Sequence, residues 1–138
     1  MQRDTKLYTM MDAFASSGSA GTAIQVDDFQ HIIMYMTFDG SVKVMIQGSI
    51  SDVEPGNWDA LPTVGSELGW GYVSSVDLNS GSTIAGTVGY TGVTSTFQNN
   101  LVKVNTVGLK WVNIIMTETE GGTPDSSATV KVRLFNNS

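Results

Sequence analysis

The chain has 138 residues, which is enough for one domain of ordinary size with its own hydrophobic core. Its 13 acidic residues outnumber its 7 lysines and arginines, giving a net charge of −6, so we expect no nucleic-acid and no membrane contact, since both need clustered cations. Cysteine is absent and His31 is the single histidine, which excludes disulfides, thiolate chemistry and metal centres built on several Cys or His side chains.

The N-terminal 21 residues differ in pattern from the rest of the chain. Residues 16–21 are Ser, Gly and Ala only, which is typical of a flexible joint. The pattern predicts a short N-terminal arm or helix that either reaches a neighbouring subunit or folds back over its own core. Before the joint, large apolar side chains follow a helical spacing: Leu7, Met10, Met11 and Phe14.

From residue 22 onward the apolar residues recur mainly with a period of two, which predicts strands. Residues 29–38 are almost continuously apolar, as in a strand buried on both faces. Asp39-Gly40 then predicts a tight hairpin into residues 41–50. In that segment Val42, Val44 and Ile46 fall on one face of the predicted strand, and the residues between them fall on the other.

A long loop at residues 51–67 separates this hairpin from the second half of the chain. There we expect shorter strands at 70–78 and 83–88, followed by an antiparallel pair at 101–107 and 109–117. In the last strand, 128–135, every second residue is apolar and Thr129, Lys131 and Arg133 face outward.

About eight strands and no interior helix predict an all-β fold, an antiparallel β-sandwich of jelly-roll-like type. We expect residues 1–21 to form the arm and joint, and residues 22–138 to form the sandwich domain.

The sequence offers little for catalysis. His31 lies within an apolar strand pattern, which favours a structural histidine over a member of a catalytic triad. The carboxylates fall mainly in turns, where turn propensity explains them better than paired catalytic acids or a calcium loop. No glycine run precedes a Lys-Ser/Thr pair, so a phosphate loop is excluded. We therefore expect no enzyme, no catalytic residue, no cofactor and no metal.

Aromatic side chains leave a binding function open. Rings can stack on sugars, but a small sandwich also needs large aromatics to fill its core. Trp111 matches the core pattern, whereas Trp58 lies in a polar loop. Trp58 and Tyr90 are the residues that we single out as possible ligand-binding residues.

Several segments resemble small β-sandwich proteins of tailed-phage virions. The stretch GSISDVEPGNWDAL (Gly48 to Leu61) resembles their "G-S-x-D-x…W-x-x-L" hairpin, and AIQVDDFQHIIMYMT is similar to their opening strand pair. VKVNTVGLKWVNIIMT and SATVKVRL resemble a later hairpin and the last strand. The resemblance covers residues 22–135 and consists of core and turn patterns.

This resemblance implies a structural protein of a bacteriophage virion, foremost a capsid decoration (cement) protein located on the capsid surface. Its expected partners are other copies of itself, with a trimer as the first expectation, and a major capsid protein or another virion protein. The alternative is a glycan- or receptor-binding module of a phage fibre, head-fibre adaptor or baseplate. For subunit contacts we expect exposed strand edges and the N-terminal segment to act, with the interface residues Leu7, Tyr8, Met10, Met11 and Phe14.

Overall fold

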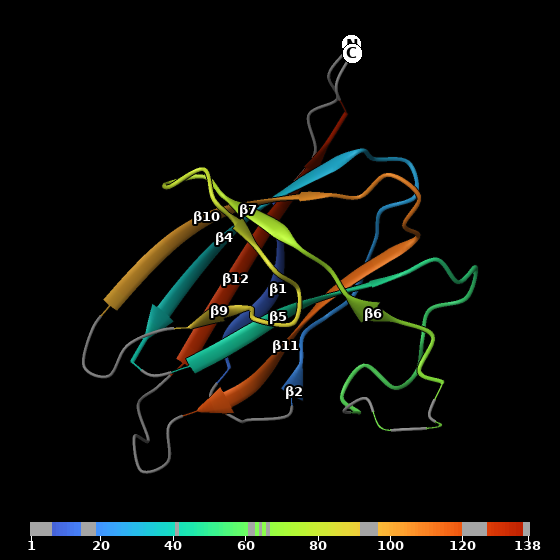
Figure 1. Ribbon diagram of the computed structural model, residues 1–138, viewed down its shortest axis with the longest axis horizontal. Coiled ribbons are helices and arrows are strands. Elements are labelled where there is room, and N and C mark those ends of the chain that lie inside the picture. The colour runs from blue at the N-terminus through green and yellow to red at the C-terminus, as the bar shows by residue number, and fades with distance from the viewer. Residues whose placement is uncertain are drawn as a thin grey trace.

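The computed structural model describes residues 7–14, 19–40, 42–60, 63, 65, 67–91, 97–119 and 127–136. These residues form twelve strands and no helix, arranged in two layers (Figure 1). Because no helix is present among them, this part of the chain contains no helical segment that could cross a membrane.

Two antiparallel sheets make up the layers. Sheet A has the spatial order β1 (Tyr8–Phe14), β12 (Ser127–Phe135), β4 (His31–Asp39), β10 (Phe97–Asn105), β7 (Ser75–Asp77) and β8 (Thr83–Ile84). Sheet B has the order β2 (Ser19–Ala20), β11 (Trp111–Thr119), β5 (Val42–Ser49) and β6 (Gly71–Tyr72), while β3 (Ile24–Gln25) pairs with β11 and β9 (Tyr90–Thr91) with β5.

The predicted fold class, an all-β antiparallel sandwich, is confirmed. The predicted number of about eight strands is too low for the described residues, because several of the strands are only two residues long. Such short strands carry no recognisable period in the sequence.

Within the N-terminal segment, Tyr8–Phe14 form a strand, where a free arm or a helix was the expectation. β1 pairs with β12, with Tyr8 opposite Val132, so the sandwich begins well before residue 22. The register shifts between Thr9 and Met11, and this irregularity turns two consecutive side chains, Met10 and Met11, into the core. Because the adjacent residues Met10 and Met11 are both large and apolar, the apolar positions of this strand have the spacing of a helix in the sequence.

The tight turns connect the two sheets instead of closing hairpins within one. β4 pairs with β10 and β12 in sheet A, while β5 follows it through Gly40, at φ 83°, into sheet B. In the same way β10 lies in sheet A and β11 in sheet B. The predicted Asp39-Gly40 hairpin and the predicted pairing of 101–107 with 109–117 are therefore wrong, because a local turn signal does not specify which sheet receives the next strand.

The core lies between the sheets and consists mainly of aliphatic and methionine side chains. The inward side of β4 illustrates it, since Ile32, Met34, Met36 and Phe38 are all fully buried. The predicted alternations of β5 and β12 are confirmed, because their inward residues join the same core cluster: Val42, Val44, Ile46, Ala128, Val130, Val132 and Leu134.

Candidate interaction surface

The outer face of sheet B is covered by the chain itself. Its residues Met45, Gln47 and Ile115 point away from the central core, yet they are at most 6% exposed. The loop after β5 contributes to this cover, because the Gln47 Nε2 donates a hydrogen bond of 2.7 Å to the carbonyl of Trp58. Ser49 Oγ likewise donates to the carbonyl of Gly69 at 2.6 Å.

The outer face of sheet A is open. Strand register places Leu101, Tyr35 and Lys131 side by side across β10, β4 and β12. Tyr35 is 41% exposed and Leu101 47%, and Leu7, just before β1, is 49% exposed. The expectation that residues 29–38 form a strand buried on both faces is therefore wrong for this chain alone, because the outward residues of β4 are half-buried or exposed.

A shallow groove of about 340 Å³ runs across this open face. Its walls are mostly apolar side chains from β4, β10, β12 and the residue before β1. We call it the sheet A groove; it is lined by Leu7, Ile33, Tyr35, Leu101, Lys131, Arg133 and Phe135.

The charges around the sheet A groove are positive. Lys103 and Arg133 flank Ile33 on the neighbouring strands, and Lys131 lies beside Tyr35. These three cations are three of the seven in the whole chain, whose net charge is −6. No acidic residue stands opposite β4 from His31 to Thr37. An acidic protein thus presents one apolar face with a basic rim.

His31 lies at the end of the same face. Its ring packs against Phe135, with ring centroids 5.6 Å apart. Burial lowers the pKa of His31 from its ordinary value of 6.5, and the nearby Lys103 lowers it further, since both disfavour the imidazolium form. The expectation of a structural histidine agrees with this position beside an aromatic ring.

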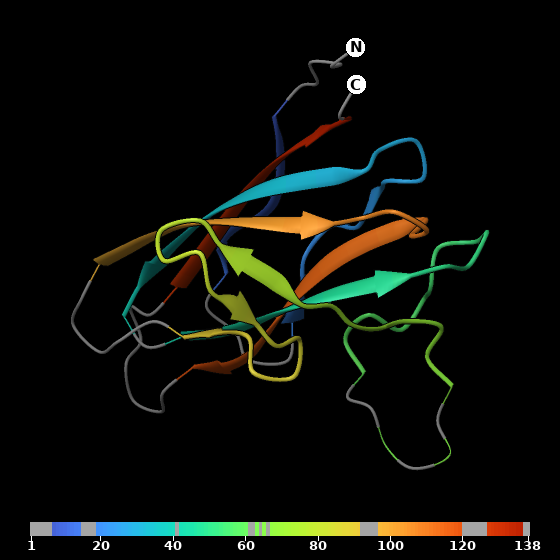
Figure 2. The same cartoon turned by 45° about the horizontal axis from the view of Figure 1, so that its top comes forward.

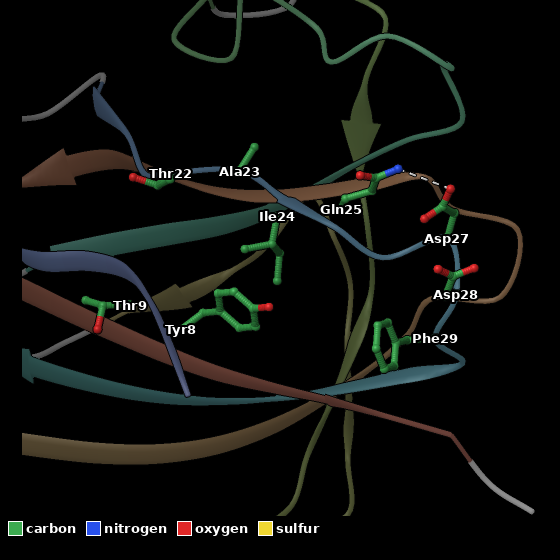
Figure 3. A pocket seen from close by; sticks show the side chains of 9 residues that line it. All are labelled: Tyr8, Thr9, Thr22, Ala23, Ile24, Gln25, Asp27, Asp28 and Phe29. Atoms are coloured by element: carbon green, nitrogen blue, oxygen red, sulfur yellow. Dashed lines mark hydrogen bonds between the residues drawn. The ribbon is translucent and has the colours of Figure 1, made fainter. Parts of the chain in front are cut away.

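A second cavity, of about 550 Å³, lies beside β1 and β3 (Figure 3). The rings of Tyr8 and Phe29 and the side chain of Ile24 line it, while Asp27 and Asp28 stand at its rim. Asp27 accepts a hydrogen bond of 3.2 Å from the Gln25 amide and lies 3.9 Å from Lys110 Nζ. In the described part of the chain no three His, Cys, Asp or Glu side chains group together as metal ligands would.

The two residues predicted for ligand binding are buried and lie apart. Trp58 is 7% exposed and stacks on Trp70, with centroids 6.2 Å apart, and its Nε1 donates to Glu54. Tyr90 is also 7% exposed and accepts a hydrogen bond from Ser75 Oγ at 3.2 Å; burial raises its pKa. Neither ring presents a face on which a sugar could stack.

The predicted interface residues fall into three groups. Met10 and Met11 are each 1% exposed and belong to the core of their own chain, so a second subunit cannot contact them in this conformation. Leu7 lines the sheet A groove, whereas Tyr8 lines the cavity beside β3. The side chain of Phe14 lies outside the described residues, although its backbone pairs with Ala128.

Sequence reasoning missed most of the sheet A groove. The sequence patterns place four of its residues in strands but predict no shared surface for them: Ile33, Tyr35, Leu101 and Phe135. The signal was present in the continuous apolar run of residues 29–38, because a strand that is apolar on both sides needs a cover on both sides. The part of the chain that the structure describes buries the inward side of this strand and leaves its outward side partly exposed.

Comparisons with known proteins add a fold likeness. No protein-family model matches the chain, and no curated protein matches it either. Among solved structures, the crystal structure of the SPBc2 prophage-derived protein YomS is similar, with a TM-score of 0.63, 14% sequence identity, and coverage of 98% of this chain and 95% of that one. The likeness extends over the whole sandwich and concerns its fold.

Proposed function

We propose that this chain is a non-enzymatic structural protein of a phage virion, and specifically a capsid decoration protein. In this proposal it binds to the outside of the shell and stabilises it through contacts with a major capsid protein and with other copies of itself. Its role is adhesive and needs no cofactor.

Two general features support the proposal. The similar fold of YomS belongs to a prophage-derived protein, and both chains consist almost entirely of that fold. Only 14% of the residues are charged, well below the roughly 25% of an average soluble domain. A surface with few charges loses little hydration energy when subunits pack against it.

The observation that carries the proposal is the open face of sheet A. Contiguous exposed apolar side chains on a folded domain mark a contact site more often than isolated ones do. Here Leu7, Tyr35 and Leu101 are exposed around one groove, while the opposite sheet is closed by its own loop. The buried positions of Trp58 and Tyr90 give a glycan-binding module no comparable support.

The test uses the phage whose genome encodes the chain. We expect the protein in purified particles at a copy number that scales with the capsid lattice. Particles made without its gene should lose their DNA at a lower temperature, and adding the purified chain should restore their heat resistance. Absence of the chain from purified particles, or unchanged heat resistance without it, would contradict the proposal.

A matched pair of variants links this role to the sheet A face. Tyr35→Ser with Leu101→Ser should bind the stripped particles at least about tenfold more weakly, because central apolar anchors dominate binding energy. Val88→Ser with Val107→Ser, which changes residues 58% and 66% exposed outside the groove, should bind like the unmodified chain. Equal binding by both variants would show that another surface makes the contact.

A further inference from the structure

A second exposed apolar feature lies in the loop after β5. Ile50 and Val53 are each 76% exposed, the most exposed large apolar side chains in the described residues. Between and beside them stand two exposed acids, Asp52, whose side chain is 91% exposed, and Glu54. We call residues 50–54 the acidic tip.

The acidic tip is held at its base and projects from the sandwich. The backbone N–H of Ser51 donates to Ser49 Oγ at 3.1 Å, and Trp58 Nε1 donates to Glu54 at 3.3 Å. The loop that follows β5 extends beyond the end of the two sheets, away from β1 and β12 of sheet A (Figure 2). A projecting segment fixed by hydrogen bonds loses little entropy when it binds.

The acidic tip and the sheet A groove are complementary. The tip combines two aliphatic side chains with two carboxylates, and the groove combines apolar walls with Lys131 and Arg133. Within the described residues Lys103 and Lys131 form no ion pair, and the one cation that pairs with the tip is Lys110, 3.6 Å from Asp52. That pair is solvent-exposed and contributes little.

We propose that the acidic tip of one copy docks into the sheet A groove of a second copy. Ile50 and Val53 enter the groove, and Asp52 and Glu54 lie against its basic rim. The tip follows β5 of sheet B, whereas the groove is lined by residues of β4, β10 and β12 of sheet A, so the two surfaces belong to different sheets of one chain. Such a head-to-tail contact leaves a free tip and a free groove, which further copies extend into a ring or a chain.

The charges argue against the simpler alternative of two sheet A faces packed on each other. That symmetric contact would bring the basic rims of Lys103, Lys131 and Arg133 from both copies together. Like charges brought together in an interface are unfavourable, whereas the tip offers opposite charges. The inference deepens the proposed function and rests on its self-association.

The test is a charge exchange between the two surfaces. A tip variant, Asp52→Lys with Glu54→Lys, and a groove variant, Lys131→Glu with Arg133→Glu, should each self-associate at least about tenfold more weakly in sedimentation velocity, because each alone presents like charges. Mixed in equal amounts they should assemble again, since Lys tips then meet Glu grooves and native tips meet native grooves.

Controls separate charge exchange from misfolding. Asp28→Lys with Glu67→Lys makes the same charge change at two exposed acids outside the tip and should neither weaken assembly nor rescue the groove variant. Ile50→Ser with Val53→Ser should weaken assembly without changing circular dichroism, because both side chains are exposed in the single chain.

The outcomes distinguish this inference from the proposed function. Assembly of the mixture but of neither variant alone would support docking of the tip in the groove. Undiminished self-association of both variants, or a mixture that stays dissociated, would overturn it. If the mixture stays dissociated while the unmodified chain binds and stabilises phage particles, the decoration role stands and the tip contact is refuted; if the unmodified chain does not bind particles, the decoration role fails whatever the tip does.

Discussion

Met10 and Met11 are neighbours in the sequence and both are buried, which a regular strand does not allow because successive side chains point to opposite faces. The shifted register between β1 and β12 resolves this conflict. Gly21 completes the arrangement, since a Cβ at this position would collide with the carbonyl of Met10, and Thr22 N–H donates to that carbonyl at 2.9 Å. The two methionines therefore fix the first strand to the sandwich.

The burial of these methionines leads to a stability prediction. Met10→Ala should lower the free energy of unfolding by about 2–5 kcal/mol, because it leaves a cavity in the core. Leu7→Ala, which truncates a 49% exposed side chain nearby, should change it by less than about 1 kcal/mol. Urea unfolding followed by tryptophan fluorescence measures both. A loss of less than 1 kcal/mol for Met10→Ala would mean that β1 does not pack as described.

The packing of β1 also predicts the effect of deleting the N-terminal segment. Removing residues 1–20 takes away β1, both methionines and β2, so the remaining chain should be unfolded or much less stable. Loss of assembly after that deletion would thus report loss of the fold. Of the residues predicted for subunit contacts in the N-terminal segment, Leu7 lies at the groove.

At the scale of elements, strands with clean alternation were predictable and their partners were not. β5 and β12 follow a period of two, which fixed their inward residues. The turn at Gly40 was also recognisable, yet it crosses between the sheets. Sheet membership depends on contacts between strands distant in the sequence, such as Tyr35 with Lys131, and no local pattern encodes these contacts.

The loop after β5 is exposed in one part and buried in another. The acidic tip is exposed, whereas Trp58, four residues further along, is buried against sheet B, and its carbonyl accepts a hydrogen bond from Gln47. The sequence places Trp58 in a polar loop, which left a ligand-binding role for its ring open. Hydrogen bonds from Gln47 and to Glu54 show how a loop tryptophan is drawn inward.

Trp58 should therefore act as an anchor for this loop. Trp58→Ala should lower the free energy of unfolding by about 3 kcal/mol or more and speed hydrogen exchange of the amide groups in β5, since it uncovers the outer face of sheet B. Ile50→Ala in the same loop should do neither, because Ile50 is 76% exposed. Unchanged exchange in the Trp58 variant would contradict the anchoring role.

At the scale of the whole molecule, the two outer faces differ in what covers them. Sheet B is sealed by a loop of its own chain, and sheet A carries an apolar groove with a basic rim. Composition indicated an acidic protein with few charges, but not that three of its seven cations gather on one face. That gathering comes from the registers of β10 and β12 against β4, which become visible only when the strands are paired.

The central claim is that the open face of sheet A is covered in the working assembly. Hydroxyl-radical labelling read by mass spectrometry tests it directly, on the dilute single chain and on the same chain in oligomers or bound to particles. We predict that labelling of Tyr35, Leu101 and Phe135 falls severalfold on assembly, while labelling of Val88, 58% exposed outside the groove, stays constant. Equal labelling of Tyr35 and Leu101 in both states would contradict the claim, since the face would then remain open to solvent in the assembly.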